Sequence, residues 1–315
     1  MSRATYKDNP TPIAINRINF DIKQIEDSKD TLSIEGLYFN FDNESGDIST
    51  KYKMLIIGPA DSPYEGGFYL FNSQFPDQYP FHPMTMKTCT QGGGVRKHPN
   101  LYTCGKCCFS FLGTWSGPPW TACQNPKTVA ASIRSVMTEY PLENEPGWEK
   151  IKDERQKSYA RLISYFNIKW AVVGILEKVN SEFVCFKKDI IYNFINKYDF
   201  YVKKLSEFDH LYGTKENSPT YGFSITYDSH DVKLRLEELY KMYAPKPTSS
   251  NVDSHTKTTG NQSTIKIKVA RKPPTEPAKN YEVGTKMANN KGDMYIVKTR
   301  MRDSKTYNVW SRCKE

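Results

Sequence analysis

Cysteines gather in one short stretch of the chain, between His98 and Ser110. Cys104 and Cys107 form a CxxC pair, and Cys108 follows directly. Structural zinc usually takes two such pairs at a recognisable spacing, and only one pair is present here. A metal centre is therefore not favoured, although a set of four ligands could be completed from Cys89, His98, Cys108 or Cys123.

Two other chemistries use a reactive thiol directly. A dithiol redox site places its CxxC at the start of a helix that follows a strand, and the residues around Cys104 show no such context. A thiol hydrolase needs a histidine base and a third group that orients it. None of the five histidines lies in a recognisable protease signature: His82, His98, His210, His230 and His255.

Thioester carriage is the fourth possibility. A cysteine can take an acyl group from another thioester and pass it to an amine without a triad, because the exchange is nearly thermoneutral. The protein then chiefly positions the reactants and stabilises the oxyanion, for which an asparagine amide suffices. The amine must lose its proton, which a carboxylate or a drier pocket assists. Against all four stands the simpler interpretation that the cysteines are small buried apolar side chains, which composition alone favours.

The elements that must position this stretch follow from periodicity. Isoleucines at spacings of three and four, with Pro12 in the first turn, predict a helix over 11–26. Aromatic and β-branched runs bounded by turn residues predict four strands at 31–41, 51–58, 68–75 and 84–90. A long loop over 91–125 precedes helical patterns at 126–139, 150–180, 187–209 and 229–243. Strands grouped before helices indicate an α+β fold.

The charge is unevenly placed along the 315 residues. Residues 244–315 hold 15 of the 44 basic and 6 of the 35 acidic residues, so the preceding part is neutral and the tail carries the whole net charge of +9. Such a tail attracts nucleic acid or acidic partners, or simply aids solubility. With no apolar run long enough to span a membrane and no secretory signal, we expect no membrane association and reduced thiols in the cytoplasm or nucleus.

Several motifs in register resemble the ubiquitin-conjugating enzyme family. Gly58-Pro59, the run from Ser62 to Phe68, the YPxxP segment 79–83 and His98-Pro99-Asn100 occur in the family's order, and Cys108 lies eight residues after Asn100. The segment 112–120 resembles the extended loop of the large carriers, and 144–147 resembles their NEPG turn. Similarity to the Z-type carriers extends over about 12–243. The end of the tail resembles small β modules of large DNA viruses at Gly284, Gly292, Tyr295 and Trp310.

The resemblance implies roles for individual residues. Cys108 is the thioester nucleophile, and Asn100 donates to the oxyanion or braces the loop that holds Cys108. Glu145 is an acidic residue that orients the incoming lysine. The scaffold of the two motifs is formed by His98, Pro99, Tyr79 and Pro80. The ligase-facing loops contribute Phe81, Trp120 and Ala122; for Trp120, packing against the helix at 126–139 is the better interpretation. Cys107 stands where the family usually has an aliphatic residue, which raises the possibility of loading on the wrong cysteine.

The expected fold is therefore the α+β ubiquitin-conjugating fold with a helical C-terminal extension. We divide the chain into a catalytic core at 1–150, a helical extension at 151–243, a basic flexible linker at 244–280 and a small β-rich basic module at 281–315. The expected partners are ubiquitin or a similar modifier, an activating enzyme, a ligase and substrate lysines, with nucleic acid possible at the tail. No cofactor is expected, since ATP is used by the activating enzyme. Arg17 on the first helix faces the activating enzyme or is ordinary surface charge. The alternative function is a non-catalytic binding module of the same fold.

Overall fold

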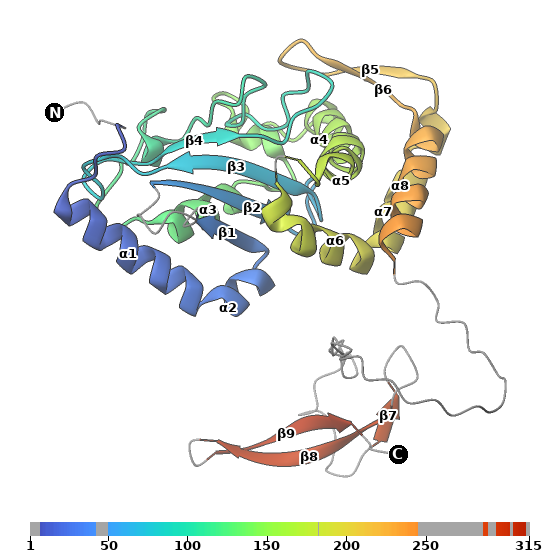
Figure 1. Cartoon of the computed structure of the whole chain (residues 1–315). Helices are drawn as coiled ribbons and strands as arrows, with labels where there is room; N and C mark the ends of the chain where they lie inside the picture. The colour runs from blue at the N-terminus through green and yellow to red at the C-terminus, as the bar shows by residue number, and fades with distance from the viewer. Residues whose placement is uncertain are drawn as a thin grey trace, which may run out of the picture. The chain divides into compact units, whose positions relative to one another are not determined.

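A computed structural model describes residues 7–41, 50–181, 183–244, 286–288, 294–302 and 305–312. The chain divides into two compact units, Met1–Pro247 and Thr248–Glu315. The first unit combines a four-stranded antiparallel sheet and a two-stranded hairpin with helices, so the predicted α+β class is confirmed (Figure 1). Most of the predicted linker lies outside the described residues, and the domain limits expected from the sequence remain predictions.

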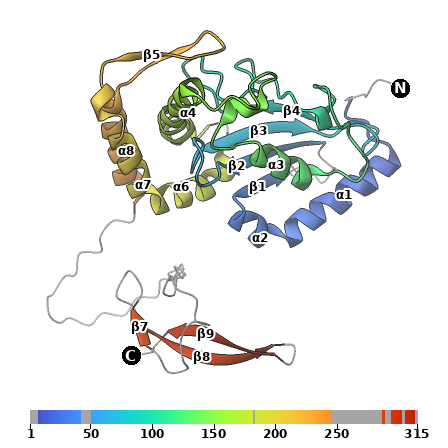
Figure 2. The ribbon, with the colours of Figure 1, turned by 180° about the vertical axis from the view of Figure 1, so that it is seen from behind.

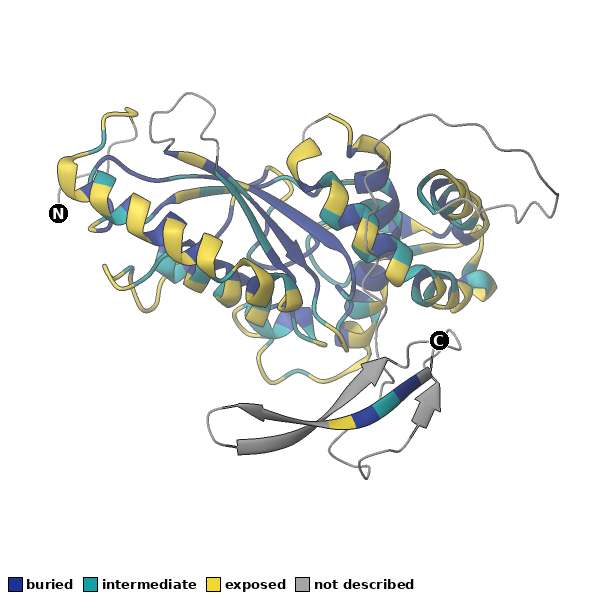
Figure 3. Ribbon diagram, turned by 60° about the horizontal axis from the view of Figure 1, so that its bottom comes forward, coloured by how far each residue is buried: buried dark blue, intermediate teal, exposed yellow. Residues whose placement is uncertain are grey.

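The isoleucine-rich segment forms helix α1, Pro12–Asp27, as predicted. Thr11 caps it, since its side chain accepts a hydrogen bond from the backbone N–H of Ala14. Ile18, Ile22 and Ile25 are buried on one face. Figure 3 shows the opposite face of α1 exposed to solvent.

The predicted strand at 31–41 is wrong in its first half. Residues Lys29–Ile34 form a second helix, α2, and strand β1 begins only at Leu37. Gly36 separates the two elements with a φ of +73°, the left-handed conformation that ends helices and favours glycine. Leu32 is buried, whereas Ile34, two residues later, is 88% exposed. Residues two apart lie on the same face of a strand but on different faces of a helix, so this burial pattern fits a helix.

The four strands form an antiparallel meander in sequence order. The other three predicted strands are confirmed. Consecutive residues of β2 and β3 are buried toward the end near Ile57 and Phe68, which pair with each other, so both faces of the sheet are covered there. The strands are β1 Leu37–Phe41, β2 Lys51–Ile57, β3 Phe68–Gln74 and β4 Thr85–Thr88.

Helix α3, Pro126–Ser135, begins at a capping box in which Asn125 and Thr128 satisfy each other's backbone N–H groups. It lies in front of the sheet in the reverse view (Figure 2). The predicted helix at 150–180 begins at Glu154 and continues without a break through a π-helical segment. Its three parts are α4 Glu154–Phe166, the π-helical Asn167–Val173 and α5 Gly174–Lys178.

The predicted helix at 187–209 is two helices, because Lys197 leaves the helical conformation at φ −111°, ψ 10°. The described residues after it also contain a short hairpin that the sequence patterns did not predict. Its strands are β5 Lys215–Asn217 and β6 Ser224–Thr226, too short for a periodicity signal. The helices are α6 Lys187–Asn196, α7 Tyr198–Ser206 and α8 Ser229–Tyr243.

Short 3-10 turns complete the first unit at Ser110–Leu112, Pro141–Asn144, Val184–Phe186 and Asp209–Leu211. None of the helices within the described ranges combines the length and apolar character needed to cross a membrane. In the second unit, three antiparallel strands form one sheet in sequence order. They are β7 Lys286–Ala288, β8 Met294–Arg302 and β9 Lys305–Arg312.

Candidate active site

Cys108 lies in the long loop between β4 and α3, and its side chain is covered. The residue is 2% exposed, and its thiol donates a hydrogen bond to the backbone carbonyl of Thr114 at 3.1 Å. The Thr114 hydroxyl accepts from the N–H of Phe109 at 2.9 Å and donates to the carbonyl of Cys107 at 2.9 Å. These hydrogen bonds hold the exposed segment 113–119 against the sulfur of Cys108. A macromolecular acyl donor can therefore reach the sulfur only when this segment moves.

Asn100 holds the backbone of Cys108 on both sides. Its side-chain Nδ2 donates to the carbonyl of Cys108 at 2.7 Å, and its own carbonyl accepts from the N–H of Cys108 at 2.8 Å. The amide is therefore occupied by the loop itself. Of the two roles considered for Asn100, this geometry supports bracing of the cysteine loop.

His98 is a buried and neutral part of the same scaffold. Its Nδ1 accepts from the N–H of Asn100 at 3.0 Å, and its Nε2 lies 3.0 Å from the carbonyl of Val136. These partners assign the proton to Nε2. Burial lowers the pKa of His98 to about 4, with the hydrogen bond to Val136 opposing that shift. His98 consequently does not serve as a general base in this arrangement.

We expect the His98 ring to remain neutral through the physiological range. Its folded pKa of about 4 lies below the unfolded value of 6.5, so unfolding takes up a proton in this window. The stability contributed by the neutral ring is therefore lost as the pH falls from 6.5 towards 4. An NMR titration, with His98→Gln to assign the resonances, should show no change for this ring between about pH 7.5 and about pH 5.5. A midpoint near 6.5 would contradict the buried geometry.

Two buried ionisable groups lie beside this scaffold, and sequence reasoning did not single out the first. Lys97 is fully buried, and its Nζ has no hydrogen-bond partner among the described residues. Burial lowers its pKa to about 7. Cys107 is also buried, and burial raises its pKa to about 12, so it remains a thiol near neutral pH. A protonated and inaccessible Cys107 is a poor competitor for loading.

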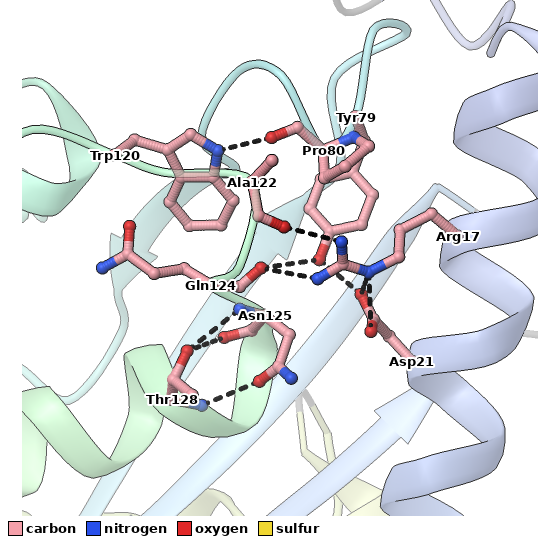
Figure 4. A network of polar contacts seen from close by, with 9 residues as sticks. All are labelled: Arg17, Asp21, Tyr79, Pro80, Trp120, Ala122, Gln124, Asn125 and Thr128. Carbon is pink, nitrogen blue, oxygen red and sulfur yellow. Dashed lines mark hydrogen bonds and ion pairs between the residues drawn. The ribbon is translucent and has the colours of Figure 1, made fainter.

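Arg17 and Asp21 form the centre of a polar network that joins α1 to two loops (Figure 4). The buried Asp21 carboxylate accepts from Arg17 Nε at 3.0 Å and from the Tyr79 hydroxyl at 2.5 Å. The guanidinium also donates to the carbonyls of Ala122, at 2.6 Å, and Gln124, at 3.0 Å. Arg17 thus joins helix α1 to the loop that contains Ala122 and Gln124, and it is not an ordinary surface charge.

The same network fixes the two loops expected to face a ligase. Trp120 donates from its indole Nε1 to the carbonyl of Pro80 at 2.6 Å, and its ring centre lies 6.2 Å from that of Tyr79. Phe81 is 63% exposed, whereas Trp120 is only partly exposed. A fixed loop that presents one exposed aromatic side chain suits an interface anchor. The ligase-binding role of Phe81, Trp120 and Ala122 stays a prediction.

Glu145 is connected to the cysteine loop through two residues that sequence reasoning missed. Its Oε2 accepts from the hydroxyl of Tyr221 at 2.5 Å. The Tyr221 ring centre lies 4.5 Å from the guanidinium of Arg96, and Arg96 Nη2 donates to the carbonyl of Pro99 at 2.5 Å. No motif signals these contacts, because they join segments far apart in the chain.

The structure thus brings Cys108, Asn100, His98 and Pro99 together directly, and Glu145 through Tyr221 and Arg96. The predicted ligase-facing residues belong to the separate network around Arg17. Within the ranges that the structure describes, no three His, Cys, Asp or Glu side chains converge in a way that could hold a metal ion.

Comparison with known proteins agrees with this fold and loop. The family model described as ubiquitin-conjugating enzyme matches residues 18–166. Ubiquitin-conjugating enzyme E2 Z of Xenopus tropicalis is 37% identical over 206 residues, covering 65% of this chain and 66% of that protein. The human E2 Z is 40% identical over 172 residues, covering 54% and 49%. The matches span less than two thirds of each relative's length.

A solved Toxoplasma gondii ubiquitin-conjugating enzyme E2 domain gives a TM-score of 0.38 at 22% identity. It covers 50% of this chain and 98% of that one, a likeness too weak to add to the assignment. The family-model match, together with the helix, the antiparallel meander and the cysteine loop, defines residues 18–166 as a ubiquitin-conjugating enzyme domain. This domain belongs to the ubiquitin-conjugating enzyme family, and the resemblance of the chain to the family's large Z-type members is confirmed.

Proposed function

We propose that the chain accepts ubiquitin or a ubiquitin-like modifier on Cys108 from an activating enzyme and transfers it to a lysine, with or via a ligase. The observation that supports this most is the loop itself. Asn100 of the His-Pro-Asn motif holds the backbone of Cys108 from both sides, inside a domain of the matching family. The domain at 18–166 comes from a family of transferases, which supports an enzyme over the alternative of a non-catalytic binding module.

The proposed reaction is two thioester steps. The Cys108 thiolate attacks the modifier's thioester carbonyl, a new thioester forms and the activating enzyme's thiolate leaves. A lysine amine later attacks this thioester and gives up a proton, an isopeptide bond forms, and the Cys108 thiolate leaves. Positioning supplies much of the rate of such transfers. The Cys108 thiol is buried and hydrogen-bonded to the Thr114 carbonyl. The segment 113–119 therefore has to move before the modifier is loaded. Gly113 and Gly117, both at positive φ, give this segment backbone conformations that other residues rarely adopt.

The chain needs no cofactor of its own in this scheme, since the activating enzyme consumes the ATP. The same scheme places the protein among ligases and substrates of the cytoplasm or nucleus. Phe81, exposed next to Pro80 in the loop fixed by the network around Arg17, is the proposed anchor for a ligase.

Loading by an activating enzyme tests the proposal. The full chain, incubated with activating enzyme, ATP and ubiquitin, should form an adduct that a thiol reductant removes. Parallel reactions with other modifiers identify which one is carried. A chain that binds a ligase but forms no adduct with any modifier would support the binding-module alternative instead.

A further inference from the structure

The hairpin β5–β6 lies beyond the residues matched by the family model, yet its turn reaches the active-site loop. Tyr221 occupies this turn with a φ of +63°. For a bulky residue, this left-handed conformation is an outlier that persists only where surrounding contacts hold it. Its hydroxyl donates to Glu145 Oε2 at 2.5 Å, and its ring packs beside the guanidinium of Arg96.

Arg96 contacts both Tyr221 and the His-Pro-Asn motif and so connects them. Its guanidinium contacts two aromatic rings, 3.4 Å from the ring centre of Tyr102 and 4.5 Å from that of Tyr221. From this position Nη2 donates to the carbonyl of Pro99 at 2.5 Å, and Nε lies 3.4 Å from the carbonyl of His98. A displaced Tyr221 would remove one of these two aromatic contacts from the guanidinium.

The hairpin that carries Tyr221 is attached firmly to helix α4. Glu216 on β5 accepts hydrogen bonds from Ser158 at 2.7 Å and from Arg161 at 2.5 Å. Tyr159, also on α4, donates to the carbonyl of Arg96 at 2.5 Å, and its ring meets those of Tyr221 and Phe223 edge to face. Tyr221 is therefore presented to the active-site loop by a rigid element, as a precise positioning contact requires.

We propose that Tyr221 is a positioning residue for lysine transfer, through which the C-terminal extension orients the Glu145 carboxylate and, by way of Arg96, the His-Pro-Asn loop. The inference rests on the proposed function and deepens it. The Tyr221 hydroxyl occupies one oxygen of Glu145, which fixes the carboxylate plane and leaves the other oxygen to orient the amine. Loading of Cys108 does not involve an amine and does not depend on this contact.

Single-turnover discharge of the preformed thioester to free lysine tests the proposal on the full chain. Tyr221→Phe removes the hydroxyl and keeps the ring on Arg96, so we expect normal loading. Its discharge should need about tenfold more lysine for half-maximal rate, the size expected for losing one hydrogen bond to a charged group. Tyr221→Ala should in addition lower the maximal rate, because Arg96 loses its aromatic neighbour. Tyr212→Phe, an exposed tyrosine stacked on His230, is the matched control and should match the parent protein in both steps.

A double-mutant cycle separates positioning from simple stabilisation. If Tyr221 acts through Glu145, Tyr221→Phe should slow discharge much less in a Glu145→Gln background than in the parent protein. Additive effects, or a Tyr221→Phe variant whose lysine dependence is unchanged, would overturn the inference while the loading of the parent protein still upholds the proposed function. Failure of the parent protein to form any adduct would overturn both.

Discussion

Cys108→Ala is expected to abolish the thiol-sensitive adduct completely, while Cys107→Ala leaves it largely intact. Cys108 is the cysteine whose backbone is held by Asn100 and whose thiol lies against the exposed segment 113–119. Cys107 is buried, and burial raises its pKa to about 12, so very little thiolate forms at neutral pH. Gel analysis of loading reactions with and without reductant measures both outcomes.

The remaining cysteines supply the controls for this experiment. Cys104 and Cys123 are exposed, so their alanine variants test whether an accessible thiol is loaded adventitiously. Cys108→Ser adds a chemical check, because an ester to serine resists the reductant that cleaves a thioester. An adduct that persists in Cys108→Ala and disappears in Cys107→Ala would move the nucleophile to the neighbouring residue and refute the assignment.

Lys97→Met is expected to stabilise the protein at neutral pH by several kcal/mol. The Lys97 ammonium is buried without a hydrogen-bond partner among the described residues, and its pKa falls from 10.5 to about 7. This lowering of the pKa corresponds to about 5 kcal/mol, an upper limit because the protein relaxes around the charge. Methionine fills a similar volume without a polar group.

The pH dependence of the stability gained by Lys97→Met shows whether removal of the buried charge causes it. The folded pKa lies below the unfolded one, so the penalty is fully present below about pH 7 and vanishes as the pH approaches 10.5. Urea unfolding of both proteins at about pH 7 and about pH 10 should show the advantage of Lys97→Met shrinking at the higher pH. Lys150→Met, at an exposed position, controls for general effects of losing a lysine. A destabilised Lys97→Met would show that Lys97 is charged and paired with an anion such as the Cys107 thiolate.

Local patterns in the sequence predicted the parts of the fold that depend on neighbouring residues. The isoleucine spacing predicted α1, and aromatic runs predicted β2 and β3. The family resemblance, and not a local pattern, implied that Asn100 braces the loop of Cys108, and a hydrogen bond joins the two residues. Local patterns failed at Thr31–Ile34, where strand-forming residues adopt a helix that exposes Ile34.

Contacts between distant segments could not be predicted from one sequence. Arg17 looks like surface charge on a helical pattern, and only the folded chain brings the carbonyls of Ala122 and Gln124 to it. The same holds for Tyr221 and Glu145, whose contact depends on a hairpin too short to leave a periodic signal. The burial of Cys108 under Thr114 is likewise a property of loop packing, since composition says nothing about which side of a thiol is covered.

The unbroken run of helical backbone from Glu154 to Lys178 has a mechanical consequence. It crosses residue 166, where the family match ends, so no flexible joint lies at that border. Tyr159 on α4 donates to the carbonyl of Arg96, which supports the cysteine loop. Further along the same helical run, Lys169 forms an ion pair at 2.7 Å with Asp228, the residue just before α8. A displacement of α8 would therefore reach the supports of the cysteine loop through continuous helical backbone and side-chain contacts, with no flexible joint between them.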